Sequence, residues 1–472
     1  MLRPSTRDAR FIIRKYFLVV SDLFFLISSL LLYIKYFYIY DLWPRKTLTE
    51  NPGWYALLLL VWLVYSNAFR LYSAINAPRT AVLLGRTSLV AIATAATYIM
   101  IPFFSPNFPI TRLPFFVFIG LVVVVMTLWH WVFSALFRHP MLIKRVLVIG
   151  AGWSGQEISK VLQSKEVFHN TGYRVLGFID DDPDKKGQVY NGLRVLSDSS
   201  DLFTYSRRLG IDEIVLAAHT AKSIRGTMYG HLVNCESYGI PVTPVNMIYE
   251  SVTGKMMVKQ KGDSHILTYE YYSKKKDLLY LMINRVLNLV FGLIGVFGLL
   301  ALIPLVWFVN LFVSRGPLFY SQIRVGRDNQ PFTIYKFRTM IVDAEKNTGA
   351  VWAGDNDPRI TLAGKFYRKT RIDELPQFWN VLKGAMNLIG PRPERPVFCD
   401  ELVKKISFFN TRHLVKPGIT GWAQVRHKYG NTDEDALIKL QYDLYYIKYQ
   451  SFMLDLSIIW QTISVMLKFK GN

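Results

Sequence analysis

Cysteine is almost absent from this sequence, with only Cys235 and Cys399 among its 472 residues. Two cysteines so far apart form neither a disulfide framework nor a metal cluster, which fits soluble parts that lie in a reducing compartment. Zinc-finger spacings, an RNA-binding aromatic motif and an arginine-rich tail are missing too, so we expect no nucleic acid partner. The formal net charge of +22 therefore favours other anions, namely phosphate lipids and nucleotides.

Long apolar runs are concentrated in the first third of the chain. Four of them are long enough to cross a bilayer of about 30 Å as helices: 17–40, 53–71, 81–104 and 113–137. The first run is not followed by the small-residue cleavage site of a signal peptide. Basic residues precede the first run, surround the second loop and follow the fourth run. The positive-inside rule therefore predicts a four-helix transmembrane region over 1–140, with both of its flanks in the cytoplasm.

A fifth apolar run, Leu278–Val313, is too long for a simple span and contains Pro304. Proline removes a helical hydrogen bond and kinks the chain. Both flanks of the run are basic, so a full crossing would leave one basic flank outside. We predict a re-entrant helix over 278–313 that enters from the cytoplasm, breaks near Pro304 and leaves on the same side; a fifth full span is the alternative.

The middle segment, 141–265, predicts a Rossmann-like domain. A strand at 145–149 leads into a turn with Gly150, Gly152 and Gly155, and a later strand at 173–179 ends at Asp180. This order is typical of a dinucleotide-binding βαβ unit, in which glycines let backbone amides approach a pyrophosphate. The three glycines are therefore candidate cofactor-binding residues. The alternative is that they only allow the helix to pack closely on the strand.

The C-terminal part, 274–472, is rich in arginine, lysine, glycine and proline, as expected for rigid loops that bind phosphates. Within it, Asp373 and Glu374 stand next to each other among basic residues. Neighbouring helical side chains point about 100° apart, so the two acids can do different jobs. One could attack phosphorus and the other could hold Mg²⁺. An acid pair alone is more typical of a helix start or a solvated face.

Four strings make this region resemble the bacterial polyprenyl-phosphate sugar-phosphate transferases, the large monotopic phosphoglycosyl transferases of the exopolysaccharide branch. They begin at Lys336 (KFRTM), Arg368 (RKTRIDELPQ), Gly390 (GPRP) and Lys416 (KPGITGWAQV). The resemblance covers the C-terminal part and the whole three-part plan. It implies an integral membrane protein with an α-helical N-terminal bundle, a Rossmann-like α/β domain and an α+β catalytic domain with a re-entrant membrane helix.

The resemblance also implies a mechanism at the cytoplasmic face of the bacterial inner membrane. Asp373 would be the nucleophile on a UDP-sugar, releasing UMP, and Glu374 would bind Mg²⁺. Undecaprenyl phosphate would then take the sugar phosphate from Asp373, starting exopolysaccharide, capsule or O-antigen synthesis. Further residues are expected to bind the substrates: Lys336, Arg338, Arg359, Arg368, Arg392, Pro393, Gln424 and, in the C-terminal tail, Asp443. The resemblance assigns no role to Arg371. Membrane lipid and a second copy of the chain, in a homodimer, are further expected partners.

Three other functions remain open from the residues. A membrane glycosyltransferase would move only the sugar and release UDP, without a nucleophilic Asp373. A nucleotide-sensing membrane scaffold would have an inert C-terminal part, which the acid pair and the arginines argue against. A sugar-nucleotide oxidoreductase would need a Tyr-x-x-x-Lys motif that is absent. No residue decides which sugar is carried.

Overall fold

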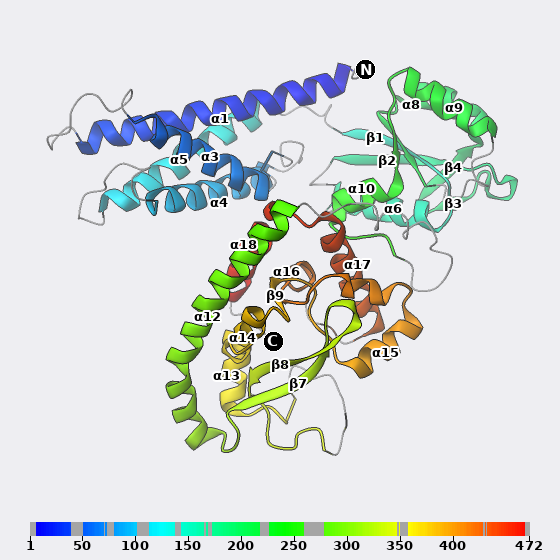
Figure 1. The fold of residues 1–472 in the computed structure, drawn as a ribbon. Coiled ribbons are helices and arrows are strands. Elements are labelled where there is room, and N and C mark those ends of the chain that lie inside the picture. Colours follow the sequence, from blue (N-terminus) through cyan, green and yellow to red (C-terminus); the bar gives the residue numbers. More distant parts are fainter. Residues whose placement is uncertain are drawn as a thin grey trace. The chain divides into compact units, whose positions relative to one another are not determined.

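The computed structural model of the chain forms two units, Met1–Thr253 and Gly254–Asn472, whose elements are labelled in Figure 1. The structure describes residues 6–38, 51–69, 71–72, 80–101, 113–136, 143–164, 167–168, 172–217, 226–258, 278–346, 349, 357–427, 430 and 432–467. The predicted domain boundaries at 140, 265 and 274 lie outside these residues.

The first unit begins with an α-helical bundle made of α1 (Thr6–Tyr38), α3 (Pro52–Ala68), α4 (Thr80–Ile99) and α5 (Leu113–Leu136). Each predicted apolar run thus forms a helix, which confirms the helical N-terminal region. By length and composition, α1 over Tyr16–Tyr36 and α5 could cross a membrane, as could α12 of the second unit. The helix α3 has 17 residues, which at 1.5 Å per residue is about 26 Å.

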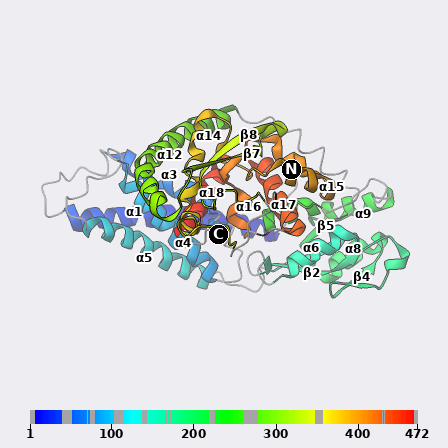
Figure 2. The same ribbon diagram turned by 90° about the horizontal axis from the view of Figure 1, so that it is seen from below.

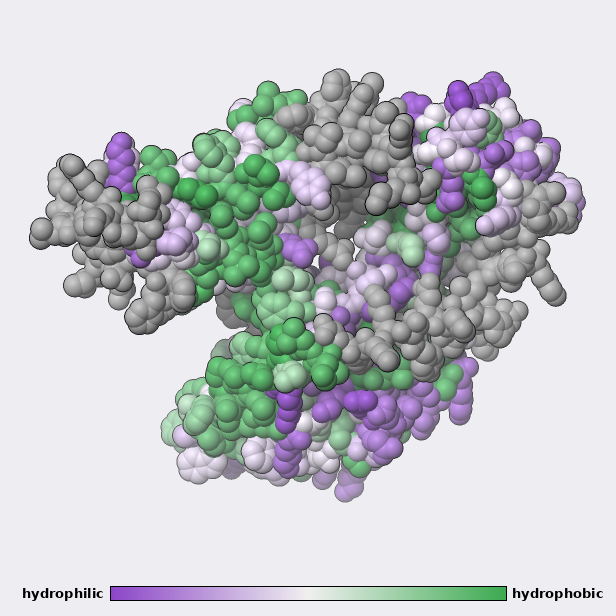
Figure 3. Space-filling model, turned by 45° about the horizontal axis from the view of Figure 1, so that its top comes forward, coloured by the Kyte–Doolittle hydropathy of each residue, from purple (hydrophilic) through white to green (hydrophobic). Residues whose placement is uncertain are grey.

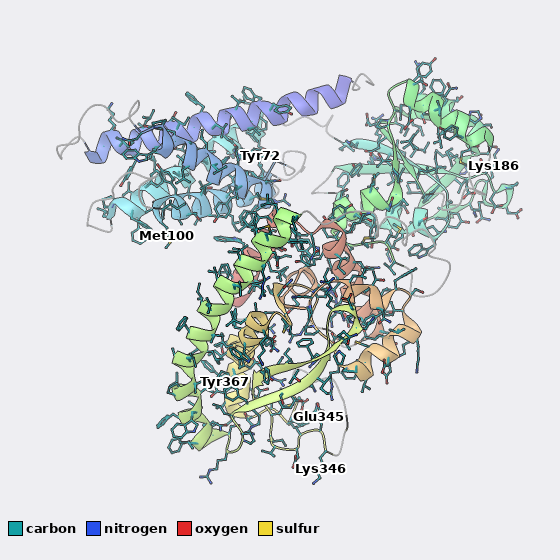
Figure 4. The ribbon with its side chains drawn as sticks, in the orientation of Figure 1. Tyr72, Met100, Lys186, Glu345, Lys346 and Tyr367 are labelled. Atoms are coloured by element: carbon teal, nitrogen blue, oxygen red, sulfur yellow. The ribbon has the colours of Figure 1, made fainter. Side chains whose placement is uncertain are left out.

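A polar network lies in the interior of the bundle. Asp22 and His130 are fully buried, with 2.9 Å between Asp22 Oδ1 and His130 Nε2. His130 Nδ1 lies 2.6 Å from the Thr87 hydroxyl, and Tyr72, labelled in Figure 4, donates to Asp22 Oδ2 at 3.0 Å. Ionisable groups among apolar helices need such partners, so this network joins α1, α4 and α5.

The first unit continues as a Rossmann-like domain around a six-stranded sheet of order β3-β4-β2-β1-β5-β6. All neighbouring strands are parallel except β3 and β4. The strands are β1 (Lys144–Ile149), β2 (Tyr173–Ile179), β3 (Val189–Tyr190), β4 (Leu193–Ser197), β5 (Glu213–Leu216) and β6 (Val242–Pro244). The helices are α6 (Trp153–Gln163), α8 (Leu202–Leu209), α9 (Gly226–Ser237) and α10 (Val245–Thr253). The alternation of strands and helices confirms the predicted domain type.

The second unit begins earlier than the predicted catalytic domain. Its first residues cross its core, because Met256 and Val258 are buried with Trp422 and Leu440, and Met256 N–H donates to Gln441 O at 3.0 Å. The packing of this apolar segment, rather than charge or motif, sets the boundary at Gly254.

The second unit contains α12 (Leu278–Val313) and a two-stranded antiparallel sheet of β7 (Phe319–Val325) and β8 (Pro331–Phe337). These are followed by α13 (Leu362–Thr370), the 3₁₀ turn η6 (Ile372–Glu374), α14 (Gln377–Lys383) and β9 (Asn387–Ile389). The rest is α15 (Pro396–Lys405), η7 (Phe409–Leu414), β10 (Gly418–Thr420), α16 (Trp422–Arg426), α17 (Asp433–Tyr449) and α18 (Phe452–Leu467). The short strands β9 and β10 pair in parallel.

One face of α12 packs on the rest of the second unit, where α12 lies beside α14 (Figures 1 and 2). A Cβ atom on Gly295 would come within 2.1 Å of the Phe378 ring, and one on Gly292 within 2.7 Å of Leu382. Asn288 lies on the same face, where its side-chain oxygen accepts from Leu388 N–H at 2.6 Å. The small and polar residues of α12 therefore fix it against the elements that carry the acid pair.

The remaining surface of α12 is exposed and apolar. Figure 3 shows these side chains as a continuous green region beside hydrophilic surface of the same unit. The large exposed side chains include Leu289, Leu293, Phe297, Leu300, Leu305 and Phe308. A continuous exposed apolar surface of this kind is typical of contact with lipid or with another apolar surface.

Candidate functional site

The acid pair lies where α13 ends and α14 begins, opposite β8. Arg371 ends α13 with a φ of 61°, a left-handed conformation that costs a residue with a Cβ about 1–2 kcal/mol. This reversal starts η6, which places Asp373 and Glu374 in a buried position. The neighbouring strand β8 contributes Lys336. A strained backbone residue therefore positions both acids.

Three cations surround one oxygen of Glu374. Arg392 Nη2 lies 2.7 Å from Glu374 Oε1, Lys336 Nζ lies 3.5 Å from it and Arg371 Nη1 lies 3.6 Å from it. Asp373 has no comparable set of contacts, and its Oδ1 atom is buried without a hydrogen-bond partner among the described residues. The two neighbouring acids thus differ, since Glu374 is held by the protein and Asp373 presents a free oxygen.

The electrostatics of the two acids differ in the same sense. Burial, with the nearby charge of Glu374, raises the pKa of Asp373 to about 6. Burial alone would raise the pKa of Glu374, but Arg392, Lys336 and Arg371 together hold it well below its usual range. Burial also lowers the pKa of Lys336 to about 8. Near neutral pH the cluster therefore contains two carboxylates and three cations in a mostly buried place, an arrangement that can hold a phosphoryl group.

Arg392 is supported by a second layer of contacts. Its Nη1 atom donates to Gln424 Oε1 at 3.2 Å, so Gln424 orients the arginine. Its backbone carbonyl accepts from Arg412 Nη2 at 2.9 Å, and Arg412 in turn donates to Asp443 Oδ2 at 2.8 Å. Asp443 was predicted to bind substrate. Among the described residues its buried carboxylate accepts hydrogen bonds from Arg412, which links it to Arg392 beside Glu374.

Other predicted substrate-binding residues lie outside this cluster. Arg338 holds the end of α12, since its guanidinium donates to Asn310 Oδ1, to the Ser314 carbonyl and, at 2.7 Å, to Pro317 O. Arg359 is paired with Asp357, its Nε donating to Oδ1 at 2.9 Å.

Two further predicted residues also have structural contacts. Arg368 Nε donates to Thr339 Oγ1 at 3.1 Å, and the Pro393 carbonyl accepts from Arg324 Nη1 at 3.2 Å. The predicted set thus separates into a group around Glu374 (Lys336, Arg392 and Gln424) and a group that holds the surrounding loops.

The structure also brings together residues that the sequence did not single out. Arg371 had no assigned role and now contacts Glu374. Arg412 is buried between Asp443 and Arg392. Nothing in the sequence around Arg412 marks it, because its role depends on contacts with residues far away in the chain. For Arg371 the only available signal was its position two residues before Asp373.

The residues of the acid pair fit a magnesium ion. Within the described residues, no group of three or more His, Cys, Asp or Glu side chains could hold a metal. Mg²⁺ needs no such group, since it usually takes one or two carboxylates and completes its coordination with water and substrate phosphates. The Glu374 carboxylate can offer its second oxygen, Oε2, to such an ion, since the three cations lie around Oε1.

The glycine turn of the Rossmann-like domain is a second predicted site. A Cβ on Gly155 would lie 1.8 Å from Gly150 O, so Gly155 is required for packing α6 against the strand before it. Gly150 has a φ of 96° and Gly152 has open space around it. Asp180 accepts from Ala151 N–H at 2.7 Å and from Asp182 N–H at 3.0 Å. Asp180 thus holds the glycine turn, and nucleotide binding at this turn stays a prediction.

Comparisons with known proteins agree with this arrangement. The family described as bacterial sugar transferase matches residues 279–469, and one described as CoA-binding domain matches residues 67–225. A UDP-N-acetylgalactosamine-undecaprenyl-phosphate N-acetylgalactosaminephosphotransferase of Aeromonas hydrophila is 40% identical over 257 residues, covering 54% of this chain and 59% of that protein.

Two further relatives match. A putative undecaprenyl-phosphate N-acetylgalactosaminyl 1-phosphate transferase of Bacillus subtilis (strain 168) is 47% identical over 144 residues, 30% of this chain and 80% of that protein. A UDP-galactose-lipid carrier transferase of Erwinia amylovora is 30% identical over 358 residues, 70% of this chain and 69% of that protein.

By length and composition, three of the described helices could cross a membrane, and the second unit holds a buried acid pair beside three cations. The chain belongs to the bacterial sugar transferase family. Its match with the Aeromonas protein spans 59% of that relative's length.

Proposed function

We propose that this chain transfers a sugar 1-phosphate from a UDP-sugar to undecaprenyl phosphate and releases UMP. The observation that carries the proposal is the contrast within the acid pair. Asp373 presents a buried, unpaired carboxylate oxygen, and cations gather around its neighbour Glu374. The names of the relatives supply the substrate classes, and they differ in the sugar, which is N-acetylgalactosamine in one and galactose in another. The sugar carried by this chain is therefore left open.

In the first step, a carboxylate oxygen of Asp373 forms a bond to the phosphorus that carries the sugar. The bond from this phosphorus to the bridging oxygen of the diphosphate breaks, and its electron pair leaves with UMP. Lys336, Arg371 and Arg392 stabilise the charge on the phosphoryl oxygens, which is where positive groups contribute most in phosphoryl transfer. The product is an aspartyl phosphosugar.

In the second step, a phosphate oxygen of undecaprenyl phosphate attacks the same phosphorus. The bond to Asp373 breaks, its electron pair returns to the carboxylate, and the product is a lipid diphosphate sugar. Both steps use one site, so the water-soluble donor and the lipid acceptor need not be bound together. This product would begin the synthesis of an exopolysaccharide, a capsule or an O-antigen.

Glu374, with Asp373 beside it, would hold the Mg²⁺ ion. The ion would neutralise charge on the diphosphate of the donor. The cations around Glu374 Oε1 keep this acid ionised and fix its orientation, and the protein residues carry out each bond change described above.

The membrane geometry is also part of the proposal. Both ends of α12 are tied to the same unit, since Tyr280 donates to Asp455 at 2.8 Å near one end and Arg338 binds Asn310 near the other. This favours a re-entrant helix over a crossing helix. The sequence predicted that this helix breaks near Pro304. In the structure α12 continues through Pro304, so the proline does not divide it into two helices. The basic flanks support the proposal that the site faces the cytoplasm at the bacterial inner membrane.

The test identifies the nucleotide product and the covalent intermediate. Detergent-solubilised enzyme receives Mg²⁺, undecaprenyl phosphate and each of a panel of UDP-sugars. We expect UMP from at least one donor, and without the lipid a burst of about one UMP per enzyme with a phosphosugar on Asp373 by mass spectrometry. Release of UDP would mean that only the sugar moves, which would reject the proposal.

A further inference from the structure

The segment after Asp373 continues as a right-handed helical run into α14. Leu375 and Pro376 both have αR backbone angles and join η6 directly to α14. Backbone hydrogen bonds along it join residues three positions apart, from Leu375 N–H to Ile372 O and from Phe378 N–H to Leu375 O. Gln377 therefore lies about one turn after Asp373, and Asn380 follows about one turn further along α14.

The three side chains differ in their hydrogen bonds. Asn380 is fully used, since its Nδ2 donates to Thr333 O at 2.7 Å and its Oδ1 accepts from Tyr335 N–H at 3.3 Å. Gln377 is 2% exposed, and its Nε2 has no partner among the described residues. Asp373 Oδ1, one turn away, has none either. An acceptor and a donor are thus both buried and unsatisfied within about one turn of backbone, and they do not pair with each other.

Buried polar atoms without partners are rare in folded proteins, and each one needs an explanation. A structural role would give Gln377 partners in the fold, as the edge of β8 does for Asn380. A ligand that accepts a hydrogen bond from Gln377 and is attacked by Asp373 satisfies both atoms at once. A phosphoryl group has this character, because its phosphorus is attacked and its oxygens accept hydrogen bonds.

We infer that Gln377 is a catalytic residue whose side-chain amide donates to a phosphoryl oxygen of the sugar phosphate while this group is bound to, or reacting with, Asp373. The inference rests on the proposed function and deepens it. The donor is neutral and buried, so it orients the phosphoryl group through a directional hydrogen bond. The three cations around Glu374 already supply the positive charge. It acts in both steps, since the same phosphoryl group is attacked twice.

The first variant is Gln377→Met, which keeps the length of the side chain and removes both polar atoms. The fold should be unharmed, since the change also removes an unsatisfied buried amide. We expect kcat to fall about 10- to 100-fold, at or below the effect of losing one donor to a reacting oxyanion. KM for the UDP-sugar should change less than about twofold, because an interaction made in the transition state appears in kcat.

The matched control is Asn380→Leu, on the same helix face. This change breaks the two contacts with β8, so it should lower the thermal unfolding midpoint, whereas Gln377→Met should leave the midpoint equal or higher. Exchange of labelled UMP into the UDP-sugar, measured without lipid, isolates the first step and should slow with kcat in Gln377→Met.

Each result decides a different claim. A kcat equal to the wild-type value in Gln377→Met would overturn the inference. UMP release by the wild-type enzyme would still support the proposed function. A lower unfolding midpoint in Gln377→Met, like that of Asn380→Leu, would make Gln377 structural. A change confined to KM, with a different order of preferred sugars, would assign the amide to the sugar and reject the phosphoryl contact. UDP release by the wild type would reject both the function and the inference.

Discussion

Two acids, the partly buried Asp180 of the Rossmann-like domain and the buried Asp373 of the second unit, are each associated with a motif that suggests phosphate chemistry, yet their surroundings are opposite. Asp180 accepts from two backbone amides and lies 3.3 Å from Lys185 Nζ. Asp373 keeps an oxygen without any partner in the described residues. Asp180 stabilises the local fold through these contacts, and Asp373 is available for a reaction. The difference teaches that hydrogen-bond satisfaction separates structural acids from reactive ones better than motif spacing does.

The sharpest way to break this comparison is to neutralise each acid in turn. Asp373→Asn should lower UMP formation on the order of 10³-fold or more, because the amide is a poor nucleophile. Its thermal unfolding midpoint should not fall, since the carboxylate has no partner to lose on its buried oxygen. Turnover near the wild-type rate in Asp373→Asn would mean that Asp373 is not the reactive acid.

A third acid, Asp443, sharpens the comparison. It is buried and has its hydrogen-bond partner, Arg412, yet it lies close to the site. Asp443→Asn breaks the ion pair with the buried Arg412, and leaving one such charge unpaired costs about 3–5 kcal/mol. We expect a clearly lower midpoint of denaturant unfolding in detergent.

The double variant Arg412→Met with Asp443→Leu should recover most of that stability, because it removes both charges together. Equal losses in the single and double variants would instead mean that packing, rather than the ion pair, determines the stability there.

Sequence patterns predicted much of this architecture, for reasons visible in single elements. Apolar runs of fixed length become α1, α4 and α5, and the strand-glycine-helix order becomes β1 and α6. These are local signals. The family resemblance also pointed to Asp373, Glu374 and Arg392, which the fold brings to one place.

The sequence could not distinguish arginines that serve the site from arginines that serve the fold. Arg338 and Arg392 both occur in family motifs, but one holds the end of α12 and the other contacts Glu374. Asp443 lies 70 positions after Asp373 in the chain, and only the tertiary path shows that Arg412 comes between it and the site. Gln377 was visible as part of a motif, but its unpaired amide is a property of the folded chain.

The pH dependence tests the reactive acid against its cationic surroundings. The pKa of Asp373 is raised to about 6, and the carboxylate is the reactive form, so the rate should rise about fivefold from pH 5 to pH 6. Loss of the Lys336 proton, whose pKa is lowered to about 8, should make the rate fall again above that pH. Lys336→Arg should remove the alkaline fall, and an unchanged alkaline limb would assign it to another group.

Ionisation of Asp373 should lower the stability of the fold as the pH rises, whereas it raises the reaction rate. The native state holds this proton up to about pH 6, while the unfolded chain releases it near pH 3.9. The contribution of Asp373 to stability is therefore complete below about pH 4 and is lost as the pH rises through 6. The difference in unfolding midpoint between wild type and Asp373→Asn, followed from pH 4 to pH 7, measures this slope, and a flat difference would contradict the raised pKa.

The smallest expected effect belongs to the satisfied acid. Asp180→Asn keeps one acceptor oxygen but removes the charge that Ala151 N–H and Lys185 Nζ contact. A lost charge-assisted hydrogen bond of this kind costs about 1–2 kcal/mol, so the Rossmann-like domain should unfold slightly earlier in denaturant. UMP formation by the folded enzyme should remain within about twofold of wild type, because the group lost there supports a turn of the backbone. If Asp180→Asn instead abolished turnover at unchanged stability, the glycine turn would hold a ligand that the reaction needs. Both acids would then be reactive, and hydrogen-bond satisfaction would no longer separate them.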